Sequence, residues 1–316
     1  MAHVDPLEGR LVVLIGGSGF VGTHLAEALL RRGARLRVAA RRPEGAFRLK
    51  PLANLGQLQF ARCNAADPRS IAAVMAGAQA AVWLVGTFGK DQQALQADGP
   101  GIAARAAADA GAAAFVYLSS IGADPAKSGG YHRTKGEGER NVAGAFPATT
   151  MIRPSAIFGE DAGLVPMLAG LIARLPVIPL FEPQARLQPV FVDDVATGIV
   201  AALADPARHG GHIYEAAGPD VLTMEQIHHQ IADAQGRRRT FVPMPDALAR
   251  LMTALPFSPL GADQLAMLKQ GNVATPGAPG LADLGVAAQP LSLFLERWMV
   301  RYRRHGRFTG ADGRPA

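Results

Sequence analysis

A tyrosine and a lysine near the middle of the chain have the spacing of a proton-transferring pair. Tyr131 and Lys135 are four residues apart in a segment of helical pattern, so both side chains project from one face of a helix. A neighbouring ammonium group lowers the pKa of a phenol toward working pH. Tyr131 would then exchange a proton with a substrate oxygen that Ser120, at the end of an apolar strand, also hydrogen-bonds. Ser120, Tyr131 and Lys135 are therefore the candidate catalytic residues.

A glycine-rich segment near the start of the chain predicts a phosphate-binding turn. An apolar run at 11–15 leads directly into glycines at 16, 19 and 22, and a helical pattern follows. The first glycine permits a tight turn, the second lets the backbone approach a pyrophosphate, and the third allows close helix–strand packing. The helix N-terminus then favours the negative charge of the phosphates. The candidate binding residues of this turn are Gly16, Ser18, Gly19, Phe20, Val21 and Gly22.

The end of the second apolar run bears on which dinucleotide would bind. An NAD-selective site has an acidic residue about 20 residues beyond the turn, where it binds the ribose 2′-hydroxyl. This chain has Arg41 and Arg42 there instead. Two guanidinium groups supply charge and a bidentate fork for a 2′-phosphate. NADP(H) is therefore the favoured cofactor, and NAD(H) is the alternative.

Apolar strands and amphipathic helices alternate through the first two thirds of the chain. We predict strands at 11–15, 35–40, 57–61, 80–85, 113–118, 149–152, 189–192 and 212–216, and helices at 19–32, 69–75, 92–110, 131–145 and 194–204. This alternation predicts an α/β fold with a doubly wound parallel sheet covered on both faces. Further helices are predicted at 224–234, 245–253, 262–268 and 290–303, between Pro- and Gly-rich loops. We expect a dinucleotide-binding domain at 1–218 and a smaller, mainly helical substrate or partner domain at 219–316, with interleaving around 155–190.

The spacing Gly-x-x-Gly-x-x-Gly, followed by Ser120 and Tyr131-x-x-x-Lys135, resembles the short-chain dehydrogenase/reductase superfamily, in particular its extended and atypical branches. The resemblance implies a Rossmann fold in which Lys135 also holds the nicotinamide ribose, a role that a protein without turnover would keep. It further implies that a polar residue after the third strand meets the adenine and that the chain after the fourth strand passes the ribose. The cofactor contacts added on this basis are Asn64, Val85, Gly86, Ser119, Tyr131, Lys135, Pro154 and Ile157.

Four further segments, spread over nearly the whole chain, resemble the nucleotide-binding accessory subunit family of respiratory complex I (NADH:ubiquinone oxidoreductase). They are Arg153-Pro-Ser-x-Ile-Phe-Gly159, Gln188–Ala196, Leu255–Pro259 and Pro279–Gly285. This resemblance implies a tightly held structural NADPH off the electron-transfer chain. It also implies complex I subunits of the peripheral arm as partners, near the membrane and the quinone-reduction region.

The chain departs from the mitochondrial members of that family in keeping Ser120 beside Tyr131 and Lys135. The sequence therefore leaves open whether the protein catalyses a reaction. The alternatives are a free-standing NAD(P)-dependent reductase or a nucleotide-sugar epimerase or dehydratase, and a quinone reductase or redox-sensing binding protein is a third reading.

Composition and charge exclude several other classes of function. The 316 residues are 49% hydrophobic with a net charge of +6, but the basic residues occur in short groups without interleaved aromatics, so nucleic acid is not an expected partner. The one cysteine excludes an internal disulfide and a cysteine-based zinc site. We expect no metal, and interpret Asp67, Asp193 and Asp194 as helix caps.

The expected location is cytoplasmic, because the chain starts without a secretory signal pattern. As part of the assembly, the protein would lie on the cytoplasmic face of the inner membrane. The apolar segment 162–181 is long enough to span a membrane, but its prolines predict a buried or groove-lining segment instead.

Overall fold

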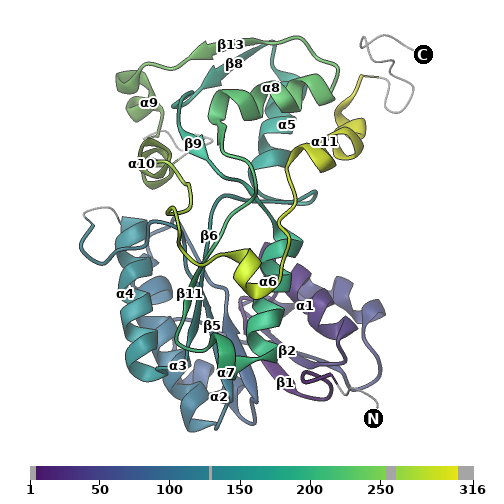
Figure 1. Ribbon diagram of the computed structural model, residues 1–316, viewed down its shortest axis with the longest axis vertical. Coiled ribbons are helices and arrows are strands. Elements are labelled where there is room, and N and C mark those ends of the chain that lie inside the picture. The colour runs from purple at the N-terminus through teal and green to yellow at the C-terminus, as the bar shows by residue number, and fades with distance from the viewer. Residues whose placement is uncertain (1–4, 128–129, 254–260, 305–316) are drawn as a thin grey trace. The chain divides into compact units, whose positions relative to one another are not determined.

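The computed structural model describes residues 5–127, 130–253 and 261–304 (Figure 1). The chain divides into two compact units, each assembled from three separate stretches of sequence. The first unit comprises residues 1–154, 192–216 and 275–287, and the second comprises 155–191, 217–274 and 288–316.

The first unit is built on a seven-stranded parallel sheet in the order β11-β6-β5-β4-β1-β2-β3. Its strands are β1 (Leu11–Ile15), β2 (Arg35–Ala40), β3 (Leu58–Arg62), β4 (Ala80–Trp83), β5 (Ala114–Leu118), β6 (Thr150–Pro154) and β11 (Ile213–Ala216). The chain runs outward from β1 in one direction through β2 and β3, and then from β4 in the other. This reversal of strand order beside β1 confirms the doubly wound fold, and it places the expected ligand crevice at the carboxyl ends of β1 and β4.

Helices cover both faces of this sheet (Figure 1). α1 packs against α6, whereas α3 packs against α2 and α4. The elements are α1 (Phe20–Arg31), η1 (Pro43–Leu52), α2 (Pro68–Met75), η2 (Gln93–Asp98), α3 (Gly99–Asp109), α4 (Gly130–Ala145), α6 (Val192–Ala204), α7 (Pro206–His209) and η3 (Leu281–Leu284). Trp83, Phe115 and Tyr117 are fully buried in the core that β4 and β5 share with α2, α3 and α4. The central strands β1, β4 and β5 are almost entirely apolar because both of their faces are buried, whereas the edge strand β3 is partly exposed.

Several elements differ from the sequence prediction. The strand predicted at 189–192 is β10 (Val190–Phe191), which pairs with β7 (Ile157–Phe158) outside the parallel sheet. The helix predicted at 92–110 begins as a π-helical turn, η2, and becomes α-helical only at α3. Pro100 has no N–H to donate to the carbonyl of Gln96, and the hydroxyl of Tyr117 donates to that carbonyl instead, at 2.9 Å. The 3₁₀ helix η1 was not predicted. Its buried residues Pro43, Ala46 and Leu49 follow a three-residue period rather than the α-helical one.

The second unit combines helices with three two-stranded sheets. β7 (Ile157–Phe158) pairs with β10 (Val190–Phe191), β9 (Arg186–Leu187) with β12 (Leu222–Thr223), and β8 (Val177–Leu180) with β13 (Thr240–Pro243). The helices are α5 (Leu164–Arg174), α8 (Met224–Ala234), α9 (Asp246–Thr253), α10 (Ala262–Gln270), α11 (Ser292–Met299) and η4 (Val300–Tyr302). Phe158, Phe191, Phe294 and Trp298 form an aromatic cluster within this unit.

The apolar segment 162–181 forms α5 and then β8, because the helix ends before Pro176. Within the described parts of the chain, none of the helices has both the length and the apolar character that crossing a membrane requires. The Leu255–Pro259 segment of the complex I resemblance lies outside the described residues.

Candidate functional site

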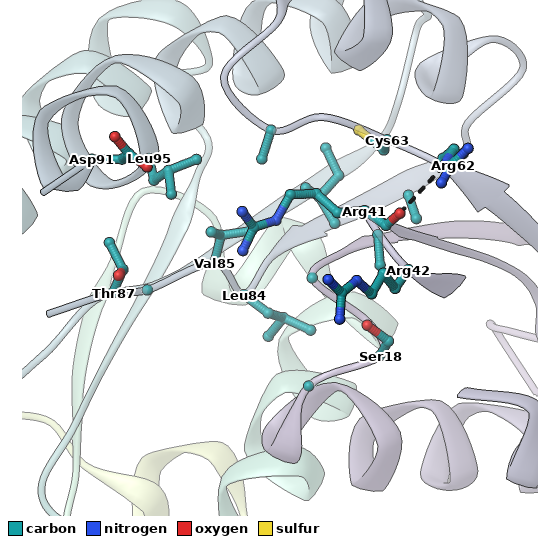
Figure 2. Close-up of a pocket in the computed structure, with 17 residues that line it drawn as sticks. Ser18, Arg41, Arg42, Arg62, Cys63, Leu84, Val85, Thr87, Asp91 and Leu95 are labelled. Atoms are coloured by element: carbon teal, nitrogen blue, oxygen red, sulfur yellow. Dashed lines mark hydrogen bonds between the residues drawn. The ribbon is translucent and has the colours of Figure 1, made fainter. Parts of the chain in front are cut away.

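A pocket of about 680 Å³ lies at the carboxyl ends of the central strands, where the strand order reverses (Figure 2). β1, β2 and β3 and the segment after β4 each contribute to its wall. Its lining residues are Ile15, Gly16, Ser18, Gly19, Ala39, Ala40, Arg41, Arg42, Arg62, Cys63, Ala65, Leu84, Val85, Gly86, Thr87, Asp91 and Leu95. This is the position at which doubly wound sheets bind their ligands.

The glycine turn has the backbone geometry that its sequence predicts. Gly16 has φ +85°, which favours glycine, and a Cβ there would lie 3.1 Å from Val85 Cγ2. Gly19 is the N-cap of α1, so the positive end of that helix points at the turn. A Cβ at Gly22 would lie 2.6 Å from the Cα of Gly17, so close packing of α1 on the turn requires glycine.

Arginines dominate one wall of the pocket. Arg41 and Arg42 follow β2, and Arg62 ends β3. In Figure 2 the Arg41 side chain extends across the pocket toward Val85, and the Arg42 guanidinium points toward Ser18. Within the described ranges, no acidic side chain forms an ion pair with any of the three. Such unneutralised cations favour an anionic ligand.

Lys135 lies directly behind the pocket wall. Its Nζ donates to the carbonyl of Leu118 at 2.8 Å and to that of Val85 at 3.5 Å, and the side chain is 2% exposed. A Cβ at Gly86, which lines the pocket, would lie 3.7 Å from this amine. Burial lowers the pKa of Lys135 to about 7, although nearby Glu139 works in the opposite direction.

Tyr131 has the opposite pKa shift from the one its sequence context suggests. Desolvation raises the pKa of its phenol to about 12 in the protein alone. The Lys135 amine donates to backbone carbonyls, and its Nζ lies 6.0 Å from the centroid of the Tyr131 ring, so its effect does not overcome burial. Phe88 stacks on the Tyr131 ring at a centroid distance of 4.5 Å and an interplanar angle of 19°.

Two serines, Ser119 and Ser120, directly follow β5. Ser120 is buried, and its hydroxyl donates to the carbonyl of Ile121 at 3.1 Å. The buried hydroxyl of Ser119 has no hydrogen-bond partner among the described residues. An unpaired buried hydroxyl costs free energy that a ligand contact would recover.

A partly buried ion pair anchors the helix that holds Tyr131 and Lys135. Arg153 of β6 binds Glu139 of α4 through two bonds, Nε to Oε1 at 2.8 Å and Nη2 to Oε2 at 2.5 Å. The bidentate geometry holds α4 in a defined position against the sheet. Neither residue was singled out for this role from the sequence.

The pocket contains only part of the predicted cofactor set. Gly16, Ser18, Gly19, Arg41, Arg42, Val85 and Gly86 line it. Phe20, Val21 and Gly22 form the first turn of α1, Ser119 and Ser120 follow β5 with Tyr131 and Lys135 on α4, and Pro154 ends β6. Ile157 belongs to β7 of the second unit. The Asn64 side chain accepts from the backbone N–H of Ala66 at 3.2 Å, and it is not among the lining residues.

Residues missed by the sequence reasoning also shape the site. Gln96 is fully buried, accepts from the Thr87 N–H at 2.9 Å and donates to Thr134 at 3.0 Å, so it fixes the segment after β4. Arg62, the last residue of β3, and Cys63, which follows it, also line the pocket. Their proximity depends on strand pairing across the sheet, and no local motif signals it.

The predicted roles of three aspartates have different outcomes. Asp67 caps α2 and accepts from the N–H of Arg69 at 3.0 Å, which confirms the prediction. Asp193 and Asp194 lie inside the first turn of α6 rather than at its cap. Asp193 contacts His24 Nδ1 at 2.6 Å and thereby joins α6 to α1. Within the described ranges, no cluster of three or more His, Cys, Asp or Glu side chains could hold a metal ion.

The doubly wound sheet and its glycine-lined crevice define an NAD(P)-binding protein of the short-chain dehydrogenase/reductase type. The residues fit such a cofactor, because the glycine turn leaves room for a diphosphate and uncompensated arginines adjoin it. The chain belongs to the NmrA-like family, whose model matches residues 8–270.

The proteins that this chain resembles include a subunit of a respiratory complex and enzymes that act alone by name, a reductase and an epimerase. The chain is 28% identical to the Arabidopsis thaliana protein named NADH dehydrogenase (ubiquinone) 1 alpha subcomplex subunit 9, mitochondrial, over 95% of this chain and 80% of that protein. It is 28% identical to a ceramide reductase of Caulobacter vibrioides over 75% of this chain and 74% of that one. A solved nucleoside-diphosphate-sugar epimerase from Staphylococcus aureus has the same fold, with a TM-score of 0.71, 17% identity and coverage of 91% and 100%.

Proposed function

We propose that this protein is an NADP(H)-binding accessory subunit of respiratory complex I in which the cofactor has a structural role. The observation that carries the proposal is the pocket in which the glycine turn and Arg41 and Arg42 meet. The bound cofactor would supply hydride chemistry. The residues of this chain favour tight binding of the cofactor over its reaction with a substrate. Gly16 and Gly19 would bind the diphosphate, Arg41 and Arg42 the 2′-phosphate, and Lys135 the nicotinamide ribose.

The surroundings of Tyr131 support a structural role for the cofactor rather than a catalytic one. A general acid or base works best with a pKa near the operating pH, whereas burial raises the pKa of Tyr131 to about 12. Phe88 stacks on the ring that would otherwise face a substrate. Both features disfavour proton transfer at this phenol.

The similarity to the Arabidopsis complex I subunit extends over 95% of this chain and supports an assembly role. Complex I subunits of the peripheral arm would be the partners, on the cytoplasmic face of the inner membrane, so contact with the membrane surface would come through the assembly.

Purification from solubilised membranes tests this proposal. The protein should migrate with NADH:ubiquinone oxidoreductase activity, and denaturation should release NADPH, identified by mass, that quinones do not oxidise. If all of the protein separated from complex I during purification, the assembly role would be refuted. Recovery without any dinucleotide would refute the cofactor role.

Replacing Arg41 and Arg42 with alanine should change cofactor preference. Loss of charge-assisted hydrogen bonds costs about 1.5–3 kcal/mol each, so each single change should weaken NADPH binding by roughly ten- to a hundredfold. NADH, which lacks the 2′-phosphate, should lose less than threefold by direct titration. Arg35→Ala, at the opposite end of β2, is the matched control and should leave both affinities unchanged. Equal losses for the two dinucleotides would contradict the assignment.

A free-standing NADP-dependent reductase is the second candidate. Two observations favour it. The chain has the candidate catalytic residues Ser120, Tyr131 and Lys135 after β5 and on α4, and it is similar to a ceramide reductase. Its substrate would be a carbonyl compound.

Tyr131→Phe separates the two candidates. A reductase should lose carbonyl turnover by about 10²–10⁴-fold, because the phenol supplies the proton, while NADPH affinity stays within twofold of wild type. A structural subunit should have no turnover for the change to remove. Steady-state oxidation of NADPH with apolar aldehydes and ketones measures the difference.

A further inference from the structure

Arg62 is a third cation in the cofactor pocket, and it comes from a strand that carries no nucleotide motif. It is the last residue of β3, and its register partner on β2 is Ala40, the residue before Arg41. The parallel pairing therefore brings Arg62 beside the Arg41–Arg42 segment, as Figure 2 shows. Its Nε donates to the backbone carbonyl of Arg41 at 3.4 Å, so the Arg62 side chain lies at the edge of the pocket beside the segment that carries the other two arginines (Figure 2).

The charge balance of the pocket indicates what these arginines bind. Among the lining residues that the structure describes, Asp91 is the one carboxylate, and it lies across the pocket on the side of Leu95 (Figure 2). Elsewhere in the first unit, Arg31, Arg133 and Arg153 each pair with a glutamate. Arg41, Arg42 and Arg62 have no such partner in the described parts of the chain. Three like charges that line one pocket without a carboxylate partner make its potential positive, which favours an anionic ligand.

We propose that Arg62 binds the 2′-phosphate together with Arg41 and Arg42 and is a determinant of NADP(H) over NAD(H) binding. The inference rests on the proposed cofactor role. A phosphomonoester carries about −1.5 to −2 charges at pH 7 and has three strong acceptor oxygens. Two arginines satisfy part of this acceptor set, and the positive charge and N–H donors of a third add to the attraction. Because Arg62 is exposed, salt should weaken its contribution.

Arg62→Gln tests the proposal with direct binding titrations at low salt. NADPH affinity should fall about five- to tenfold, as expected for one partly exposed charged contact, and NADH affinity should change less than twofold. The fragments 2′,5′-ADP and 5′-AMP should reproduce this difference, because they differ in the 2′-phosphate alone. Arg69→Gln is the matched control. This exposed arginine lies outside the pocket lining on α2, and its loss should leave all four affinities unchanged.

A conservative variant separates charge from loop positioning. Arg62→Lys keeps a cation and should retain NADPH affinity within about threefold of wild type. The proposal is overturned if Arg62→Lys is as weak as Arg62→Gln, if NADPH and NADH weaken equally, or if neither changes. If the wild-type protein binds neither dinucleotide, the proposed cofactor role itself fails. If wild type prefers NADPH and Arg62→Gln keeps that preference, this inference alone fails.

Discussion

Replacing Gly22 with alanine is expected to abolish dinucleotide binding. A Cβ at this position would lie 2.6 Å from the Cα of Gly17, 2.7 Å from its carbonyl carbon and 2.8 Å from the carbonyl oxygen of Gly16. All three are backbone atoms of the phosphate-binding turn, so no flexible side chain can yield. The turn and the start of α1 must separate, and the N–H groups that would face the diphosphate lose their alignment. We expect NADPH affinity to fall more than a hundredfold by titration, and stability to fall by about 1–3 kcal/mol from overpacking.

Gly144→Ala provides the matched control for this change. Gly144 lies near the end of α4, where an added Cβ would meet nothing within 4 Å. The same substitution should therefore leave NADPH binding unchanged and raise stability by up to about 1 kcal/mol through helix propensity. If Gly22→Ala bound NADPH within threefold of wild type, the glycine turn would not be the diphosphate site.

Replacing Lys135 with methionine is expected to stabilise the cofactor-free protein at neutral pH while weakening NADPH binding. Burial lowers the pKa of Lys135 from 10.5 to about 7. Between these values the unfolded chain holds a proton that the folded protein lacks, so the free energy of unfolding rises with pH across this window. Below about pH 7 the folded state carries the full cost of a buried ammonium, which amounts to several kcal/mol for a shift of this size. Methionine removes that cost and also the proposed contact to the nicotinamide ribose.

Chemical denaturation between pH 7 and 8.5 measures this effect. Burial raises the pKa of Cys63 from 9.0, and above that value this thiol contributes a dependence of opposite sign. Within the window, wild type should gain stability with rising pH and Lys135→Met should lose most of that slope. Lys90→Met, at an exposed lysine of the same unit, should keep the wild-type profile. A destabilised Lys135→Met protein that retained the slope would show that the amine is charged and paired in the folded state.

Tyr131 illustrates how far residue spacing can predict a site. The four-residue separation correctly puts Tyr131 and Lys135 on one helix, α4, because helix periodicity is local. The direction of the Tyr131 pKa could not be predicted in this way. It depends on the Phe88 stack and on which acceptors the Lys135 amine finds, and those groups come from segments far away in the chain.

The amino-acid sequence by itself determined the doubly wound sheet, the glycine turn and the arginines after β2. Buried parallel strands need continuous apolar runs, and a tight turn against a helix needs glycine. Both features therefore depend on residues that are neighbours in the sequence. Only the tertiary structure decided that Arg62 adjoins Arg41, that Gln96 fixes the segment after β4, and that Glu139 pairs with Arg153. These contacts join residues 9 to 21 positions apart across different elements. They arise from strand register and helix packing, which a local pattern of residue types does not specify.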